Sequence, residues 1–99
     1  MSLRSTIQRL RRASDFAPVW SIHAERDRLP DYERRLGIDK LGCERIVRAG
    51  AIGVAETDVH GREAVRIRGS IDGVNVEIPV ATFLHEGCEV VIIVTIIPT

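Results

Sequence analysis

The residues best suited to chemistry lie in one short stretch, WSIHAERDR, which spans residues 20–28. Ser21 can cap the start of a helix through its hydroxyl, and His23 would then lie in the first helical turn. Arg26 and Asp27 follow His23 by three and four residues, a spacing that places side chains on one face of an α-helix. Histidine exchanges a proton near neutral pH and arginine binds phosphate, so the stretch is typical of an acid–base site for a phosphate-containing substrate. The same pattern also fits an exposed histidine on an ordinary amphipathic helix, and both interpretations stand at this point.

Polar side chains in the second half of the chain are weaker candidates. Arg66 and Arg68 alternate along a predicted strand and share one face of a sheet, where they would bind an anion or pair with Glu77. His60 and His85 lie in predicted turns, where side chains are usually solvated. His23 is therefore the preferred histidine for proton transfer.

The sequence contains none of the common metal or cofactor motifs. Cys43 and Cys88 are far apart and lack a second Cys or His at short spacing, so we predict no zinc site. A glycine-rich phosphate loop, a G-x-S-x-G elbow and an H-E-x-x-H helix are also missing from the sequence. We expect no cofactor, and the two unpaired thiols indicate a cytoplasmic protein.

The charges balance overall but differ between the two halves of the chain. Residues 1–50 contain eleven Lys and Arg against seven Asp and Glu, a net charge of +4, whereas residues 51–99 contain three against seven, or −4. The N-terminal half is the side predicted to face anions, while the neutral total argues against tight, non-specific binding to nucleic acid. The apolar run VVIIVTIIP is too short to cross a bilayer as a helix, so no membrane association is predicted.

Helices are expected to hold the candidate site. The 99 residues predict one domain in three parts: an N-terminal helix and connector over 1–18, a helical part over 19–50 and a sheet over 51–99. Leu3, Ile7 and Leu10 have helical spacing in the first part. In the second part, Ser21 is expected to start a helix that Pro30 ends or interrupts.

Two further helices are predicted before the sheet. Asp31 would cap a short helix that Gly37 ends in the left-handed conformation, and Asp39 would cap a longer helix that Gly50 ends. On this longer helix the inward-facing residues are predicted to be Cys43, Ile46 and Val47. An outward pair between Glu44 and Arg48 is expected at the i, i+4 spacing.

After Gly50 the hydrophobic period changes from helical to alternating, which predicts strands over 51–57, 62–71, 74–84 and 88–98, with a turn at 58–61. The Asp72-Gly73 pair predicts a two-residue hairpin turn that places Arg68 opposite Glu77 and Arg66 opposite Pro79. Pro79 lacks an N–H, so we expect a bulge or a break in its pairing with the last strand. The expected fold is α+β, with two to three N-terminal helices packed on one face of a four-stranded antiparallel β-meander.

The last predicted strand is apolar on both faces. Thr95 is the only polar side chain between Val90 and Ile97. A strand of this kind is expected to be buried on both sides, and one layer of helices covers only one of them. The pattern therefore predicts a homodimer or a protein partner on the second face.

The order of these elements, together with WSIHAERDR, RRLGIDKLGCERIVRAGAI and VVIIVTIIP, resembles a small bacterial domain family of unknown function. Members of that family open with an S-x-H-A-x-x-R stretch, continue with R-x-I and a short helix ending in Gly, and close with a strand of the vITvi type. The resemblance covers about residues 19–98. The family is similar to the barnase–EndoU–colicin–RelE group of metal-independent ribonucleases, and some relatives are toxins that occur beside antitoxins.

The resemblance implies a site and a set of partners. The family's His and first Arg fall on His23 and Arg26, its second Arg falls on Arg34 or Arg35, and its strand threonine falls on Thr95. The segment between the two arginines is longer here than in the family. Helices would cover one face of the sheet and RNA would bind the other, with an antitoxin-like protein as a second partner.

Two hypotheses from different classes follow. The first is a metal-independent RNA endonuclease of toxin type, with His23 as general base and acid, Arg26 on the phosphate and Thr95 as a third site residue. The residues predicted to bind substrate are Arg34, Arg35, Arg66 and Arg68. The second is a non-catalytic binding or assembly module that uses the apolar C-terminal strand as a dimer or partner interface.

Overall fold

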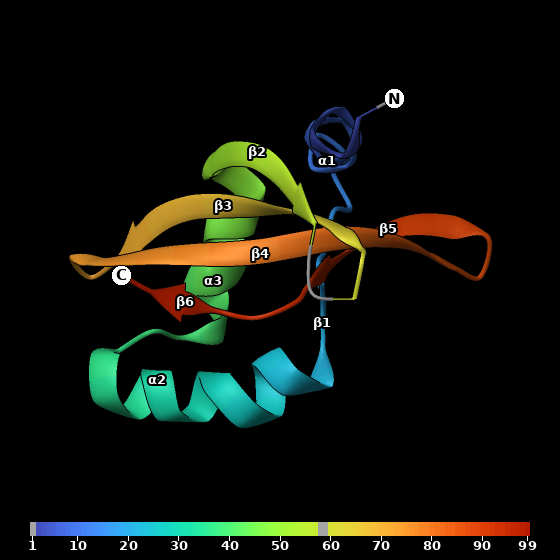
Figure 1. The fold of residues 1–99 in the computed structure, drawn as a ribbon. Helices are drawn as coiled ribbons and strands as arrows, with labels where there is room; N and C mark the ends of the chain where they lie inside the picture. Colours follow the sequence, from blue (N-terminus) through green and yellow to red (C-terminus); the bar gives the residue numbers. More distant parts are fainter. Residues whose placement is uncertain (1, 58–59) are drawn as a thin grey trace.

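The computed structural model describes residues 2–57 and 60–99, which fold into an α+β arrangement of three α-helices, one π-helical turn and six strands (Figure 1). In chain order the elements are α1 (Leu3–Leu10), β1 (Val19–Trp20), the π-helical turn η1 (His23–Arg28), α2 (Leu29–Leu36), α3 (Lys40–Ala49), β2 (Ala51–Thr57), β3 (Glu63–Ile71), β4 (Val74–His85), β5 (Cys88–Ile93) and β6 (Ile97–Pro98). The predicted α+β class is confirmed. The turn predicted over 58–61 lies partly outside the described residues.

All six strands belong to one mixed sheet, so the predicted four-stranded antiparallel meander is too simple. The strand order is β1-β5-β4-β3-β2, and β6 pairs with β4 beyond the end of β5. Strands β2 to β5 pair antiparallel with their sequence neighbours. However, β1 pairs parallel with β5, with Val19 opposite Ile92 and Trp20 opposite Ile93. The part of the chain predicted as helical over 19–50 therefore begins with a short strand ahead of its first helix.

The Asp72-Gly73 turn sets the register of β3 on β4 as predicted. Both turn residues have positive φ angles, 49° and 83°, which a two-residue hairpin turn of this type requires. Arg68 lies opposite Glu77, and Arg66 lies opposite Pro79. The two turn residues were therefore sufficient to predict which residue of β4 lies opposite each sheet arginine.

Pro79 interrupts the pairing of β4 with the last segment, which is also as predicted. β5 pairs with β4 from Val80 onward, and β6 pairs only with Val76 and Glu77. Between these ladders the Pro79 carbonyl accepts a hydrogen bond from the Val94 N–H at 2.9 Å. The chain leaves the strand direction there, and Ile96 is buried. The prediction of one continuous strand over 88–98 is therefore wrong.

The prediction that the last strand is buried on both faces is also wrong. Val91 and Ile93 are buried on the face toward the helices, whereas Val90 and Ile92 on the other face are only partly buried.

No helix within the described residues is long and apolar enough to cross a membrane.

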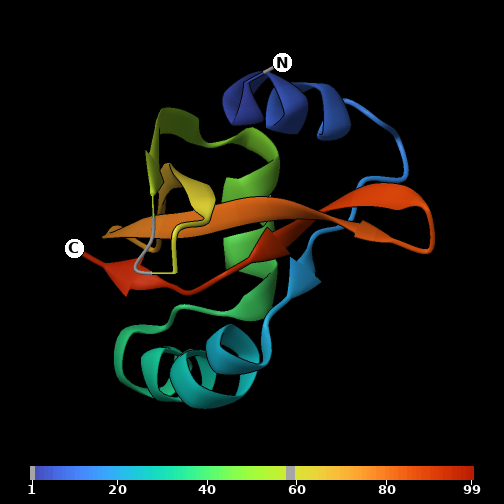
Figure 2. The same ribbon diagram turned by 45° about the vertical axis from the view of Figure 1, so that its right-hand side comes forward.

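The core lies between the sheet and α3, which runs behind the strands between α1 and α2 in Figure 2. The predicted inward residues of α3, Cys43, Ile46 and Val47, are buried. Opposite them, the sheet contributes Val65, Ile67, Val76, Ile78, Val80, Val91 and Ile93. α3 lies so close to β3 that a Cβ on Gly69 would be 2.7 Å from Cγ1 of Ile46.

The helix that begins after Ser21 is not ended by Pro30. η1 continues directly into α2, and Pro30 lies in the first turn of α2, within one unbroken helical segment. Asp31 is consequently inside the helix and does not cap it. Gly37 ends α2 with a φ of 73°, as predicted.

The predicted Glu44–Arg48 pair on α3 is not formed. Glu44 instead accepts a hydrogen bond from the Trp20 indole at 2.8 Å, and Arg48 donates to the Phe16 carbonyl at 3.1 Å. Both side chains therefore join α3 to the chain ahead of η1. The predicted cap of α3 is confirmed, because the Asp39 carboxylate accepts the Gly42 N–H at 2.8 Å.

Candidate functional site

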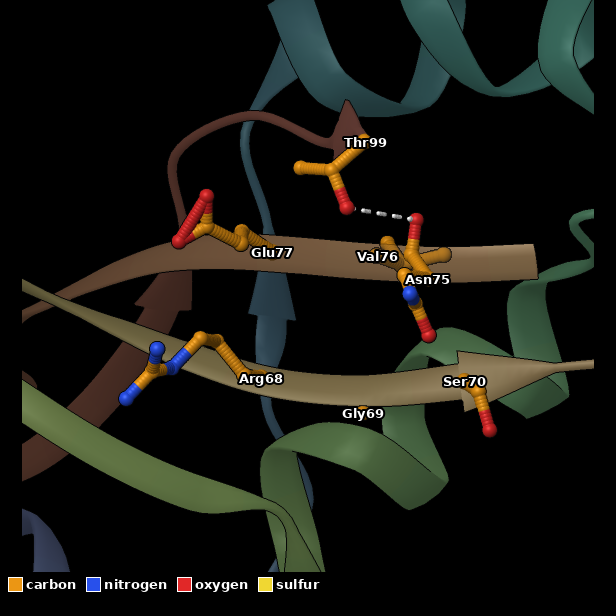
Figure 3. A pocket seen from close by; sticks show the side chains of 7 residues that line it. All are labelled: Arg68, Gly69, Ser70, Asn75, Val76, Glu77 and Thr99. Atoms are coloured by element: carbon orange, nitrogen blue, oxygen red, sulfur yellow. Dashed lines mark hydrogen bonds between the residues drawn. The ribbon is translucent and has the colours of Figure 1, made fainter.

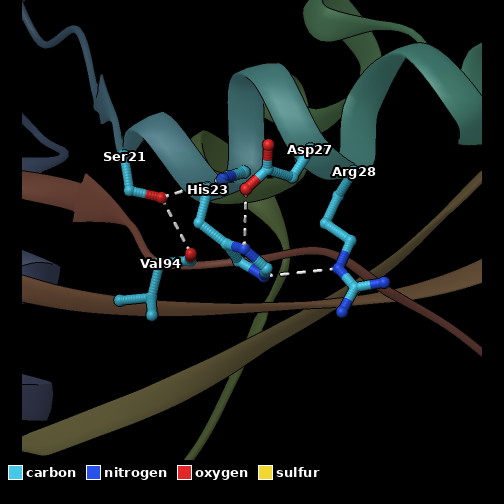
Figure 4. A network of polar contacts seen from close by, with 6 residues as sticks. Ser21, His23, Asp27, Arg28 and Val94 are labelled. Atoms are coloured by element: carbon cyan, nitrogen blue, oxygen red, sulfur yellow. Dashed lines mark hydrogen bonds and ion pairs between the residues drawn. The ribbon is translucent and has the colours of Figure 1, made fainter.

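Ser21 joins the sheet to the helix that holds His23. Its N–H donates to the Ile93 carbonyl at 3.0 Å, which extends the pairing of β1 with β5 by one residue. Its hydroxyl accepts the Ala24 N–H at 3.0 Å, so the predicted helix cap is confirmed, and donates to the Val94 carbonyl at 2.8 Å (Figure 4). One hydroxyl thus fixes the start of the helix against the end of β5.

The π-helical turn η1 decides which side chains lie together after this cap. At its end the Leu29 N–H donates to the carbonyl of Ala24, five residues earlier, whereas an α-helix uses the residue four earlier. A turn of this kind contains one additional residue. Side chains four and five positions after His23, rather than three and four, therefore become its neighbours.

His23 contacts Asp27 and Arg28, and the three side chains form the His23 cluster (Figure 4). The Arg28 Nε donates to the His23 Nε2 at 3.3 Å, and the His23 Nδ1 lies 3.4 Å from a carboxylate oxygen of Asp27. Nε2 of His23 therefore faces the guanidinium of Arg28, and Nδ1 faces the carboxylate of Asp27. The imidazole is 49% exposed. The arginine beside His23 is thus Arg28 and not the predicted Arg26.

Trp20 holds this segment against α3. Its indole N–H bonds to Glu44, and the ammonium of Lys40 lies 5.7 Å from the centre of its ring. Lys40 also bonds to Glu25 of η1 at 2.6 Å, and this bond raises the pKa of Lys40. Side chains from β1, η1 and α3 therefore meet around Trp20 and fix the helical turn that contains His23.

Arg34 and Arg35 lie on α2 and share one carboxylate. Each donates to Asp31 at 2.8 Å, and these bonds lower the pKa of the Asp31 carboxyl. Both guanidinium groups are more than half exposed. Within residues 2–57 and 60–99, neither arginine forms a hydrogen bond or ion pair with His23.

Arg66 and Arg68 occupy the sheet face that points away from α3, as predicted, but their surroundings differ. Arg66 lies 3.5 Å from Glu56 and 3.7 Å from Glu77, so Glu77 pairs diagonally and not with the directly opposite Arg68. Arg68 lines an open pocket of about 520 Å³ (Figure 3) together with Ser70, Asn75, Glu77 and Thr99. Arg68 is therefore the sheet arginine better placed to meet an anion.

Thr95 directly follows Val94, the residue whose carbonyl is bound by Ser21. It is partly buried in the segment between β5 and β6. Among the described residues it forms no hydrogen bond with the His23 cluster. The structure places Thr95 next to the Ser21–Val94 bond that anchors the helix. The Thr95 hydroxyl is not in contact with His23.

Sequence reasoning missed Arg28 because it assumed an α-helical spacing. The available signal was Pro30, which follows WSIHAERDR within an unbroken helix. A proline ring inside an α-helix clashes with the carbonyl four residues earlier, and a widened turn ahead of it is one way to keep the helix continuous.

No group of three or more His, Cys, Asp or Glu side chains that could hold a metal ion is found in the part of the chain that the structure describes.

Comparison with known proteins adds no relatives. No protein family matches the chain, and no curated protein or solved structure is significantly similar to it.

Proposed function

We propose that this protein is an RNA endonuclease that uses general acid–base catalysis, with His23 as the proton-transferring group and Arg28 as the phosphate-binding group. The observation that carries the proposal is the exposed His23 cluster, in which both ring nitrogens of His23 have a charged neighbour. A carboxylate beside Nδ1 favours the tautomer whose Nε2 can accept a proton. Arginine offers planar donors that match a phosphate.

The π turn supports this choice of arginine. The S-x-H-A-x-x-R motif of the resembled family has its arginine four residues after the histidine, so the predicted match on Arg26 is one residue short and Asp27 stands at the motif position. Because η1 contains one additional residue per turn, Arg28 at the fifth position is the arginine that reaches His23. Arg26, at the third position, is not needed at the phosphate in this proposal.

In the proposed reaction, the ribose 2′-hydroxyl of the RNA attacks the adjacent phosphorus. His23 Nε2 takes the proton of that hydroxyl while the bond from O2′ to phosphorus forms and the bond from phosphorus to O5′ breaks. The 5′-oxygen takes a proton from water, and the hydroxide that remains takes the proton back from His23, which leaves a 2′,3′-cyclic phosphate, a 5′-hydroxyl and a neutral imidazole. A phosphate bound to Arg28 would replace His23 as the acceptor of the Arg28 Nε–H and so free Nε2 for this step.

The remaining predicted residues have supporting places in this proposal. Thr95 lies beside the Ser21–Val94 anchor and would contact the substrate only after it binds. The arginines proposed to bind flanking phosphates are Arg34, Arg35, Arg66 and Arg68, of which Arg68 has a polar pocket beside it. An antitoxin-like partner and a cytoplasmic location complete the proposal, and the two free cysteines fit a reducing compartment.

The test is cleavage of a single-stranded RNA by the wild type and by His23→Ala, with a chelator present throughout. Loss of a general acid–base group is expected to slow cleavage by about 10²–10⁴-fold. His60→Ala is the matched control, since His60 is also an exposed histidine and is part of neither the His23 cluster nor the pocket lined by Phe83. Equal rates for the wild type and His23→Ala, or no cleavage by the wild type, would reject the proposal.

A second candidate function is a non-catalytic assembly module, and one observation favours it. Several apolar side chains near β5 are exposed by more than a third: Val19, Ile22, Phe83 and Leu84. A homodimer or protein partner that covers them would bury apolar surface. Light scattering distinguishes a monomer from an assembly, and a monodisperse monomer of 11.0 kDa at high concentration would argue against the assembly module.

A further inference from the structure

A pocket of about 620 Å³ adjoins the segment that anchors the His23 cluster. Ser21, which precedes His23 by two residues, lines this pocket together with Val94, to which it bonds at 2.8 Å. Ala81 and Ile92, which are paired across β4 and β5, line it together with Phe83. The pocket therefore extends from the Ser21–Val94 bond, which anchors η1, along β4.

The open edge of β4 creates this pocket. The pairing of β3 with β4 ends with Val65 opposite Val80, whereas β4 itself continues to His85. Beyond Val80, β4 pairs with β5 alone among the described residues. Ala81, Thr82 and Phe83 consequently line a space that β3 no longer fills.

Phe83 gives this pocket an aromatic surface. Its side chain is 37% exposed, although a phenylalanine of a small domain is usually more deeply buried. The His85 ring lies edge-on to it, with centres 6.2 Å apart and planes at 67°, and so restricts the orientation of the phenyl ring. A flat ligand can stack on an exposed ring that is already held in place.

We infer that this pocket binds an unstacked nucleobase of the RNA substrate, with Phe83 as the stacking surface. The inference rests on the proposed function and names its substrate class, single-stranded RNA, because a paired base cannot leave its neighbours without a cost of unstacking. The largely apolar lining suits the face of a base, and the hydroxyl of Thr82, next to Phe83, can bond its polar edge. Phe83 is four residues along β4 from Pro79, the partner of Val94, so the stacking surface lies about 13 Å from the anchor.

Binding of a short single-stranded deoxyoligonucleotide that contains one 2-aminopurine tests this inference. The probe has no 2′-hydroxyl and cannot be cleaved by the proposed reaction, and stacking of the 2-aminopurine quenches its fluorescence. The wild type and Phe83→Tyr should quench it, whereas Phe83→Leu should bind about 10-fold more weakly or worse. Leu84→Ala is the matched control, since Leu84 is 74% exposed and is not part of the pocket lining, and its affinity should equal that of the wild type.

A Phe83→Leu affinity equal to that of the wild type would overturn the base pocket, and so would equal binding of the same probe annealed to its complement. A wild type with no affinity for the probe would also overturn it, and would leave the pocket to an apolar side chain of a protein partner. RNA cleavage that depends on His23 but not on Phe83 would leave the ribonuclease standing and reject the base pocket. Probe binding that depends on Phe83 without any RNA cleavage would support the base pocket and reject the ribonuclease.

Discussion

Replacement of Ser21 by alanine should destabilise the protein more than the loss of an ordinary helix cap. The substitution removes the acceptor of the Ala24 N–H at 3.0 Å and the donor to the Val94 carbonyl at 2.8 Å. Loss of a cap costs about 1 kcal/mol, and loss of one further partly buried hydrogen bond costs about 1 kcal/mol more. The expected decrease in the free energy of unfolding is therefore about 2 kcal/mol, which corresponds to a Tm lower by about 8–16 °C in a domain of this size.

Urea unfolding of Ser21→Ala and Asp39→Ala measures this difference with a matched control. Asp39 caps α3 through the Gly42 N–H at 2.8 Å, and its side chain has no second bond among the described residues. Asp39→Ala is therefore expected to lose about 1 kcal/mol. If Ser21→Ala loses no more than Asp39→Ala, the Ser21–Val94 bond does not tie the helix to the sheet, and the reasoning about the anchor is refuted.

Two further predictions concern the core. A Cβ at Gly50 would lie 2.6 Å from the backbone oxygens of both Arg68 and Ile46, so Gly50→Ala should cost about 2–3 kcal/mol in urea unfolding. Gly53→Ala, whose nearest contact would be 3.1 Å, should cost less, and equal losses would contradict the close approach. Burial raises the pKa of the Cys43 thiol to about 12, so at pH 8 a thiol reagent should label only the exposed Cys88 in the native protein and both cysteines after unfolding. Rapid labelling of both thiols in the native protein would contradict the burial of Cys43. Cys43 ionises from about pH 8.5 only in the unfolded protein, so the free energy of unfolding should decrease as the pH rises from there toward 12.

Local signals in the sequence were sufficient for much of the fold. The caps at Ser21 and Asp39 form as predicted because each side chain bonds a nearby backbone N–H. The register of β3 on β4 follows from Asp72-Gly73, since a two-residue turn leaves only one pairing. The break at Pro79 follows from its missing N–H.

The features that the sequence did not predict depend on distant parts of the chain or on a rare helix geometry. β1 contains only two residues, too few for an alternating pattern, and its parallel pairing is defined by β5 more than 70 residues later. The alternating pattern of the last strand did not reveal that the chain leaves the strand at Val94 and that Ile96 is buried beyond this point. Arg28 was overlooked because its place beside His23 requires the i→i+5 bonding of η1.

The most direct test of the proposed site compares cleavage of single-stranded RNA by Arg28→Gln and Arg26→Gln. Both changes remove one positive charge from an exposed position of η1, but only Arg28 contacts His23. A lost charged hydrogen bond to the phosphate is worth at least about 1.5 kcal/mol, so Arg28→Gln should lower kcat/KM by about 10-fold or more. Arg26→Gln should cleave at nearly the wild-type rate. Equal effects of the two substitutions, or a larger effect at Arg26, would contradict the assignment of the site to the His23 cluster.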